Sequence, residues 1–284
     1  MKNENSQENL TILLLGTGGT IAGLLENGSQ ATAGKGYRAA QLPVEALVPA
    51  SKHRIFAEQI AQIDSKDMSF EIWEKLYVRI SAAQNDPAIH AIVITHGTDT
   101  MEETAYFLHR TLVCTKPVIL TGAMRPADAM DSDGPQNMAF AMEQAEYLSA
   151  GVWVAFAGRV LSGGNVQKVH PTRLDAFDVI DDASVAALLT PLSAFKPPIK
   201  RWPRVEIVMS YAGASGALVE ALIAQKVDGI VVAGTGNSTM HHALETALDK
   251  APEAGIAVSL STRCLAGRVI QERIDLMLGL MQSA

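Results

Sequence analysis

The chain has 284 residues, 48% of them hydrophobic, and its 23 Lys and Arg against 30 Asp and Glu leave a formal net charge of -7. This length allows a soluble globule with a sizeable core that needs no disulfides or metals for support. The basic residues form no long run, which argues against nucleic acids and anionic membranes as partners. No apolar stretch is long enough to span a membrane, and residues 1–10 lack the pattern of an export signal, so we expect a cytoplasmic or periplasmic protein.

Short apolar runs alternate with segments of helical length over the first half of the chain. The runs are TILLLG at 11–16, HAIVITHG at 90–97, KPVILTGAM at 116–124 and GVWVAFAGRV at 151–160. This rhythm predicts the α/β class, with a parallel sheet covered by helices on both faces. The clearest helix begins at residue 101, with Glu102 and Glu103 in a first turn that suits acidic side chains. Its predicted buried stripe consists of Met101, Ala105, Leu108 and Leu112.

A change of composition suggests two α/β domains. The segment 190–204 contains four prolines and several basic residues, and we interpret residues 191–204 as a linker. A larger N-terminal catalytic domain is therefore predicted over 1–190 and a smaller C-terminal domain over 205–284. In the second domain, strands are predicted within 204–213, 228–240 and 255–264, with a helix at 217–225.

The first apolar run ends in a glycine-rich turn, ILLLGTGGTIAG at 12–23. Such turns often hold phosphates, but the dinucleotide fingerprint requires glycine or alanine where this chain has Ile21. The P-loop pattern fails as well, because Leu24 and Leu25 stand where Lys and Ser or Thr are required. From this segment alone, a tight structural turn in which Thr20 caps a helix explains the residues as well as a functional site does.

A second turn of the same kind follows the run at 90–97, in the sequence VITHGTDTMEET at 93–104. In open α/β sheets the carboxyl ends of parallel strands form the ligand crevice, so we expect Thr20, Thr98 and Asp99 to meet there. For Asp99 the simpler interpretation is an N-cap of the helix that follows.

The cysteines and histidines form no pattern typical of disulfides or metal sites. Cys114 and Cys264 lack a CxxC or His-rich setting, and we expect both to be small buried apolar residues. His241 and His242 are adjacent, so on a helix they would point about 100° apart. His96 has no H-E-x-x-H spacing, which favours a structural role. The sequence therefore predicts no metal and no cofactor.

Several longer segments together resemble the bacterial L-asparaginases, which hydrolyse asparagine and often glutamine. They are TGGTIAG at 17–23, IDSKDM at 63–68, THGTDTMEETAYFL at 95–108, GAMRPADAMDSDGPQN at 122–137, NVQKVHPTRLDAF at 165–177 and DGIVVAGTGN at 228–237. These segments extend over nearly the whole chain. The resemblance implies an amidohydrolase that forms an acyl-enzyme on a threonine and acts on a small amino acid without a cofactor.

The resemblance also implies which residues are catalytic. Thr20 matches the family's nucleophile, and Tyr37 matches the tyrosine of a mobile loop that hydrogen-bonds this nucleophile. Thr98, Asp99 and Lys168 match a group in which a threonine, an aspartate and a lysine share hydrogen bonds. Without the resemblance, Tyr37 would be an anchoring residue of a flexible loop and Lys168 a solvated surface cation.

Residues that match substrate-binding positions of the family come from both predicted domains. They are Gly19, Ser65, Lys66, Gly97, Thr98, Asp99, Ala123 and Asn237. Ser65 corresponds to the serine that holds the substrate's α-carboxylate, and Asp99 to the carboxylate that pairs with its α-ammonium. Ala123 matches a position whose backbone lines the amide pocket. Lys66 replaces the neutral or acidic residue usual beside that serine, a departure that bears on the preference between asparagine and glutamine.

The resemblance further implies a homotetramer of intimate dimers, in which Asn237 contributes across a protomer interface, and a lid formed by residues 23–37. The family has a longer segment before its final helix, with an acidic residue that acts in the neighbouring subunit. Here the chain passes almost directly into RIDLMLGLMQ at 273–282. That acid is therefore either absent or replaced by a nearby residue such as Glu272.

Two other functions fit parts of this pattern. An amidotransferase subunit that acts on charged tRNA is disfavoured, because only ten residues precede the first strand and the chain is acidic. A non-catalytic amino-acid-binding protein would need Ser65 and Asp99 but not a nucleophile. The presence of Thr20, Tyr37 and Lys168 together favours the amidohydrolase.

Overall fold

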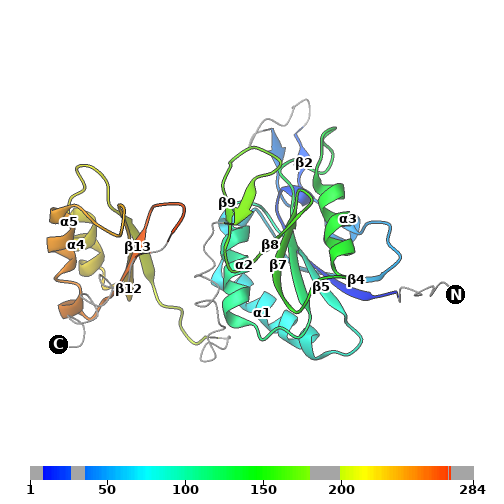
Figure 1. Cartoon of the computed structure of the whole chain (residues 1–284), viewed down its shortest axis with the longest axis horizontal. Helices are drawn as coiled ribbons and strands as arrows, with labels where there is room; N and C mark the ends of the chain where they lie inside the picture. Colours follow the sequence, from blue (N-terminus) through cyan, green and yellow to red (C-terminus); the bar gives the residue numbers. More distant parts are fainter. Residues whose placement is uncertain (1–8, 27–35, 180–198, 268, 270–284) are drawn as a thin grey trace. The chain divides into compact units, whose positions relative to one another are not determined.

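The computed structural model describes residues 9–26, 36–179, 199–267 and 269 of the chain (Figure 1). These residues form two compact units, an N-terminal unit up to residue 179 and a C-terminal unit from residue 199. Each unit has its own sheet and its own hydrophobic core. Most of the predicted linker, residues 191–198, lies outside the described residues, so the domain boundary stays a prediction.

The N-terminal unit combines one large sheet with helices and two short hairpins. Its strands are β1 (Thr11–Gly18), β2 (Leu24–Leu25), β3 (Tyr37–Arg38), β4 (Arg54–Ile63), β5 (Ala91–Thr95), β6 (Pro117–Thr121), β7 (Gly151–Phe156), β8 (Arg159–Ser162), β9 (Val166–Lys168) and β10 (Phe177–Val179). Its α-helices are α1 (Phe70–Asn85), α2 (Met101–Thr111) and α3 (Gly134–Gln144). Short 3₁₀ helices are η1 (Thr20–Ala22), η2 (Val44–Leu47) and η3 (Ser65–Asp67).

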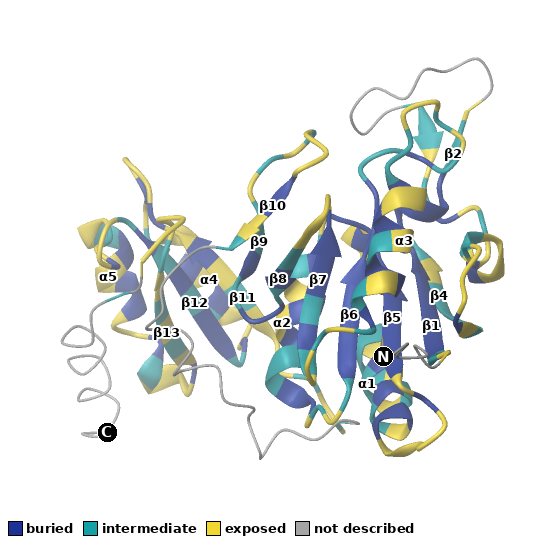
Figure 2. Cartoon of the chain, turned by 45° about the vertical axis from the view of Figure 1, so that its right-hand side comes forward, coloured by how far each residue is buried: buried dark blue, intermediate teal, exposed yellow. Residues whose placement is uncertain are grey.

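Six strands form the large sheet in the order β4-β1-β5-β6-β7-β8. Neighbouring strands are parallel except β7 and β8, which are antiparallel. Leu14 pairs with Val93, and Val93 pairs with Ile119, so β1, β5 and β6 end at the same edge of the sheet. These strands are buried along nearly their whole length (Figure 2), as expected for parallel strands covered on both faces. The predicted α/β class with a parallel sheet is confirmed.

Helices cover the two faces of this sheet. On one face α3 joins Met138 and Met142 to Leu14 and Val93 in a single buried cluster. Helices α1 and α2 lie on the opposite face (Figure 1). The stripe predicted for α2 is correct, because Met101, Ala105, Leu108 and Leu112 are each at most 2% exposed.

The edge strand β4 was not among the predicted strands. Its sequence, RIFAEQIAQI, contains no continuous apolar run, and most of its residues are only partly buried. An edge strand pairs on one side only and is covered less completely than a central strand, so its sequence tolerates polar residues. The apolar runs that identified β1, β5, β6 and β7 are therefore missing from β4.

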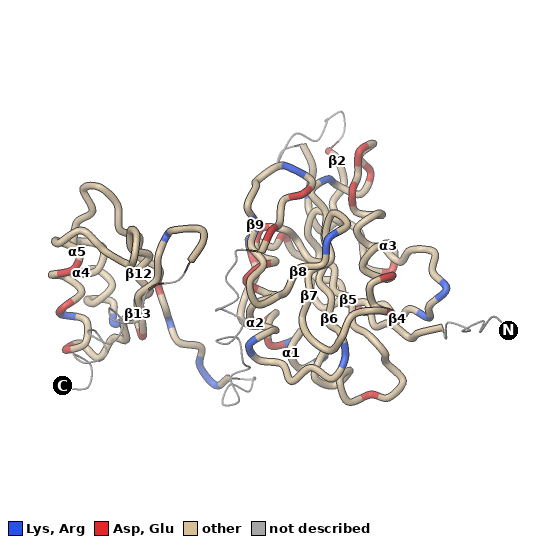
Figure 3. Tube along the Cα trace, viewed as in Figure 1, with Lys and Arg blue, Asp and Glu red and all other residues tan. Residues whose placement is uncertain are grey.

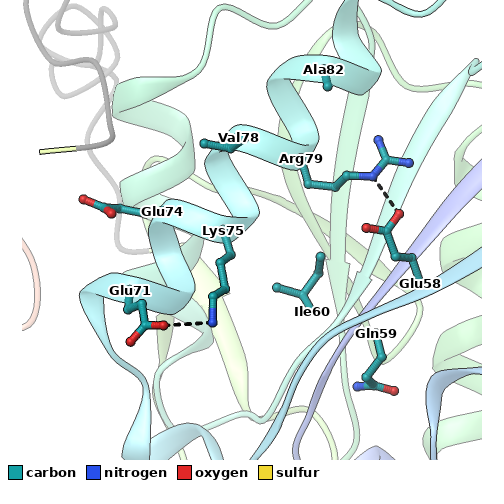
Figure 4. Close-up of a pocket in the computed structure, with 9 residues that line it drawn as sticks. All are labelled: Glu58, Gln59, Ile60, Glu71, Glu74, Lys75, Val78, Arg79 and Ala82. Carbon is teal, nitrogen blue, oxygen red and sulfur yellow. Dashed lines mark hydrogen bonds and ion pairs between the residues drawn. The ribbon is translucent and has the colours of Figure 1, made fainter.

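An open pocket of about 570 Å³ lies between β4 and α1. Four of its charged side chains form pairs, Arg79 with Glu58 at 2.6 Å and Lys75 with Glu71 at 2.9 Å (Figure 4). None of the predicted site residues lines this pocket. It is therefore separate from the site described below.

The C-terminal unit is a parallel sheet of three strands in the order β11-β12-β13. Its elements are β11 (Val205–Met209), α4 (Ala217–Ala224), β12 (Gly229–Gly234), α5 (His242–Leu248), the 3₁₀ helix η5 (Pro252–Ala254) and β13 (Ala257–Thr262). The three strands and α4 lie within the ranges predicted for them. The core of the unit joins Val208 and Val232 of the sheet to Leu222 of α4 and Leu244 of α5.

The two cysteines differ from their prediction. Cys114 is half-buried in the connection between α2 and β6, and burial raises the pKa of its thiol to about 11. Cys264 is exposed. The prediction of a buried residue is wrong for Cys264, because this residue follows the end of β13 in a surface turn, where its backbone N–H bonds to Thr262 Oγ1 at 3.1 Å.

Charged residues are spread over both units. Lys and Arg are interspersed with Asp and Glu along the chain (Figure 3). Many of them form pairs of opposite charge, such as Lys52 with Glu146 at 2.9 Å. Across the part of the chain that the structure describes, no helix has the length and apolar character needed to cross a bilayer.

The core around β5 predicts a stability difference between two identical substitutions. Val93 is fully buried, whereas Val113 is 79% exposed. Val93→Ala should lower the free energy of unfolding by about 2 kcal/mol, because it removes buried methyl groups and leaves a cavity. Val113→Ala should change it by less than about 0.5 kcal/mol. Equal effects in denaturant unfolding would contradict the position assigned to Val93.

Candidate active site

The first turn of the site follows directly from the end of β1. Gly18 and Gly19 have φ angles of 102° and 82°, in the left-handed region that favours glycine. The N–H of Gly19 donates to the carbonyl of Ile63 at 2.8 Å, which ties the turn to the end of β4. Thr20 begins η1 and makes no capping bond, because Gly19 occupies the N-cap position. The interpretation of Thr20 as a helix cap is therefore not supported.

The hydroxyl of Thr20 is paired with a tyrosine instead. Thr20 Oγ1 lies 2.9 Å from Tyr37 Oη, and Thr20 is only 9% exposed. Tyr37 is held on the β2-β3 hairpin, where it pairs with Leu25. The N–H of Leu25 in turn donates to Asp128 Oδ1 at 2.9 Å. Of the predicted lid, residues 27–35 lie outside the described residues.

The second turn packs directly against the first. A Cβ atom at position 19 would overlap the Cα and N atoms of Gly97. A Cβ atom at position 97 would lie 2.5 Å from Ser65 Oγ and 3.1 Å from Gly19 Cα. Only glycine therefore lets the ends of β1 and β5 approach this closely. Thr20 and Thr98 each follow one of these glycines, so the contact brings the two hydroxyl-bearing turns together, as expected from the sequence.

A lysine distant in sequence joins the second turn. Lys168 Nζ donates to Thr98 Oγ1 at 2.9 Å and to Asp99 Oδ1 at 2.6 Å. The Lys168 side chain is 15% exposed, so it is not a freely solvated cation, whereas the Asp99 side chain is 57% exposed. Asp99 is not the N-cap of α2 either, because Thr100 occupies that position. The structure thus brings Thr98, Asp99 and Lys168 into one hydrogen-bonded group.

Ser65 lies beside this group. Its Oγ accepts from the N–H of Asp99 at 3.2 Å, and its carbonyl accepts from Thr100 Oγ1 at 2.7 Å. The ammonium of Lys66 forms ion pairs with Asp64 at 2.7 Å and with Asp67 at 3.3 Å. The hydrogen bond to Asp64 raises the pKa of Lys66. The positive charge at position 66 is therefore largely balanced by the acids on either side.

Asp133 and Asn137 hold the loop that carries Ala123, and sequence reasoning missed both. The Asp133 carboxylate accepts from the N–H groups of Met124 and Arg125, each at 3.0 Å or less. Burial raises the pKa of Asp133, while these N–H groups oppose the shift. Asn137 Nδ2 donates to the carbonyl of Gly122 at 3.0 Å and to Asp133 Oδ2 at 3.1 Å. The four-residue spacing of Asp133 and Asn137 at the start of α3 could have indicated that they act together, because residues four apart lie on the same face of a helix.

His96 forms hydrogen bonds that hold the second turn. It is fully buried, with Nδ1 2.7 Å from the carbonyl oxygen of Gly97 and Nε2 2.9 Å from Thr104 Oγ1. A carbonyl can only accept, so Nδ1 carries the hydrogen and Nε2 accepts from Thr104. Trp73 Nε1 donates to the same threonine at 2.8 Å. Burial lowers the pKa of His96 to about 4, so the ring is neutral at pH 7.

Two family models together match nearly the whole chain. The model "Asparaginase, N-terminal" matches residues 11–198, and "Glutaminase/Asparaginase C-terminal domain" matches residues 204–283. The chain belongs to the asparaginase family. The resemblance seen in the sequence motifs is therefore confirmed.

Individual members of the asparaginase family are similar over most of their length. "Probable L-asparaginase periplasmic" of Haemophilus influenzae is 36% identical, over 93% of this chain and 80% of the relative. "L-asparaginase 2" of Escherichia coli is 35% identical, over 92% of this chain and 80% of the relative. A crystal structure of the probable cytoplasmic L-asparaginase from Campylobacter jejuni has a TM-score of 0.82 and 36% identity, covering 95% of this chain and 89% of the other.

Asn237 belongs to the C-terminal unit, whereas the residues described above belong to the N-terminal unit. Asn237 is exposed in the C-terminal unit, in the turn after β12 that Thr235 and Thr239 close through backbone hydrogen bonds. Glu272 lies outside the described residues. The role of Asn237 across an interface, and the tetramer, therefore stay predictions. Within the described ranges, no three His, Cys, Asp or Glu side chains are grouped as metal ligands.

The contact between the two glycine turns predicts a stability effect. Gly19→Ala should lower the free energy of unfolding by at least about 1 kcal/mol, because it combines an unfavourable φ with an overlap on Gly97. Gly158 has a φ of 72° but has open space around its Cα, so Gly158→Ala carries only the backbone penalty. Denaturant unfolding should show that Gly19→Ala is clearly less stable than Gly158→Ala. The reverse order would contradict the close packing of Gly19 on Gly97.

The buried His96 predicts a pH dependence of stability. Between about pH 4 and the ordinary histidine pKa of 6.5, the unfolded chain binds a proton at this residue and the folded chain does not. The free energy of unfolding should therefore rise with pH across this window, with a contribution of up to about 3 kcal/mol from His96. His96→Gln should remove that part of the slope, whereas His242→Gln, at an exposed position, should retain it. Equal slopes in all three proteins would contradict the assignment.

Proposed function

We propose that this protein hydrolyses L-asparagine to L-aspartate and ammonia through an acyl-enzyme on Thr20. The observation that carries the proposal is the direct packing of Gly19 on Gly97, which joins the Thr20 turn to the Thr98 turn. Membership of the asparaginase family supports the reaction class. The relatives named above carry asparaginase in their names.

Substrate recognition is assigned to the polar groups beside the two turns. The Ser65 oxygen accepts from the N–H of Asp99, which leaves its own O–H to donate to the substrate's α-carboxylate. Asp99 uses one carboxylate oxygen for Lys168 and is more than half exposed, so it can also accept from the α-ammonium. Paired recognition of a carboxylate and an ammonium selects a free amino acid.

In the first half of the reaction, Thr20 Oγ1 attacks the side-chain amide carbon of asparagine. Tyr37 Oη lies within hydrogen-bond distance and can relay the hydroxyl proton, accepting it while its own proton passes on. A tetrahedral intermediate forms, the proton given up by Thr20 is transferred to the amide nitrogen, the C–N bond breaks, and ammonia leaves. Backbone N–H groups of the turns are suited to stabilise the oxyanion, an effect of about 3 kcal/mol per donor in other enzymes.

In the second half, water hydrolyses the ester between the aspartyl group and Thr20. Thr98 Oγ1 accepts from Lys168, so its own proton remains available to orient a water molecule. Attack of the water oxygen on the ester carbon breaks the bond to Thr20 Oγ1, which regains its proton. Aspartate is then released.

Glutaminase activity is proposed as a side reaction. "Glutaminase-asparaginase" of Pseudomonas fluorescens is 33% identical to this chain, over 90% of this chain and 76% of the relative. The positive charge of Lys66, which departs from the family pattern, is paired with Asp64 and Asp67.

The proposed assembly is a homotetramer of intimate dimers, with Asn237 contributing to a neighbouring site. It rests on the family resemblance and on the exposure of Asn237. The proposed compartment is the periplasm or the cytoplasm, because the names of the relatives include both.

The nucleophile is tested by ammonia release from L-asparagine and, in parallel, from L-glutamine. Thr20→Ala should lower kcat by roughly a thousandfold or more, because it removes the attacking oxygen. Thr20→Ser keeps a hydroxyl at nearly the same place and should retain part of the activity. Circular dichroism and thermal unfolding of each variant check that the fold is intact.

Two outcomes would reject the proposal in different ways. A folded Thr20→Ala protein with the parent's kcat would exclude Thr20 as the nucleophile. Tight binding of asparagine by the parent in calorimetry, without ammonia release, would favour the amino-acid-binding alternative.

A further inference from the structure

Lys168 lies on β9, which is not a strand of the large sheet. Within the described residues, β9 pairs with β10 in a separate two-stranded sheet, with Lys168 opposite Phe177. The backbone ladder of the six-stranded sheet therefore does not fix the position of Lys168. Its ammonium nevertheless meets Thr98 and Asp99 at hydrogen-bond distances. Phe156 and Arg159 of the large sheet contact Phe177 of the β9-β10 hairpin. A further contact joins the end of β9 directly to the start of α2.

That contact is made by a carboxylate. Glu102 Oε2 accepts a hydrogen bond from the backbone N–H of Lys168. Glu102 is in the first turn of α2, three residues after Asp99, so one short segment contacts both the backbone and the side chain of Lys168. We propose that Glu102 is a positioning residue, which holds Lys168 so that its ammonium reaches Thr98 and Asp99.

The dipole of α2 does not account for Glu102. Glu103 is in the same first turn and is exposed, so it already places a carboxylate near the helix N-terminus. Glu102 is half-buried, and burial raises the pKa of its carboxyl, while the Lys168 N–H opposes that shift. Burial of a carboxylate is unfavourable unless hydrogen bonds compensate for the lost water. Burial raises the pKa of the Glu103 carboxyl as well, so the hydrogen bond from the Lys168 N–H is what distinguishes Glu102.

The inference rests on the proposed function for its effect on catalysis, and a double-mutant cycle tests it. Glu102→Ala should lower kcat for ammonia release from asparagine by about tenfold or more, as expected for the loss of a bond to a charged group. Glu103→Ala is the matched control and should keep the parent's kcat. Glu102→Gln retains an acceptor oxygen and should recover much of the loss.

The second arm of the cycle uses a Lys168→Met background, in which the ammonium is absent. If Glu102 acts through that ammonium, adding Glu102→Ala to Lys168→Met should cause no further loss of kcat. A purely structural contribution would lower activity by the same factor in both backgrounds. Multiplication of the two effects would therefore overturn the inference.

Hydrogen–deuterium exchange provides a readout that does not require activity. The Lys168 amide should exchange faster in Glu102→Ala than in the parent, at unchanged global stability, and should be unaffected in Glu103→Ala. Unchanged exchange at Lys168 would overturn the inference even in an active enzyme. Absence of ammonia release from the parent would instead refute the proposed function, and the exchange result would still decide whether Glu102 holds Lys168.

Discussion

The contact between the backbones of Gly19 and Gly97 is the constraint on which the site depends. It joins the ends of two parallel strands, β1 and β5, more closely than any side chain would permit. The strands themselves are held by an apolar core on both faces of the sheet. The turn after β1 has a conformation that glycine adopts most easily, and the turn after β5 has no room for a side chain at Gly97. The hydroxyl groups that follow are therefore presented at fixed positions.

Buried polar groups support each segment around that contact. His96 bonds to the carbonyl of Gly97, and Asp133 with Asn137 holds the loop of Ala123 through backbone N–H and carbonyl groups. Each of these side chains loses contact with water when it is buried, which is unfavourable unless it finds a protein partner. Because only one local geometry satisfies all of these bonds, they favour a single arrangement of the loops.

The charged residues Lys168 and Asp99 are also paired, at the more exposed side of the site. Lys168 is mostly covered and has an acid on one side and a hydroxyl on the other, whereas Asp99 is more than half exposed to solvent. An ion pair with one exposed partner keeps the lysine charge balanced and leaves the aspartate accessible. Asp99 can therefore hold the Lys168 ammonium in place and still accept the α-ammonium of the proposed substrate.

The strands with continuous apolar runs, the buried stripe of α2 and the two Gly-Thr turns could be predicted from the sequence, because these features depend on neighbours in the chain. The sequence did not identify β4, whose polar residues are tolerated only because the strand lies at the edge of the sheet. Through the family resemblance it named Thr20, Tyr37, Thr98, Asp99 and Lys168 and the hydrogen bonds expected among them, which the structure contains. The folded chain was needed to show that Glu102 and Asn137 hold backbone segments and that Cys264 is exposed. Those features arise where distant segments meet, and no local pattern of residues encodes that meeting.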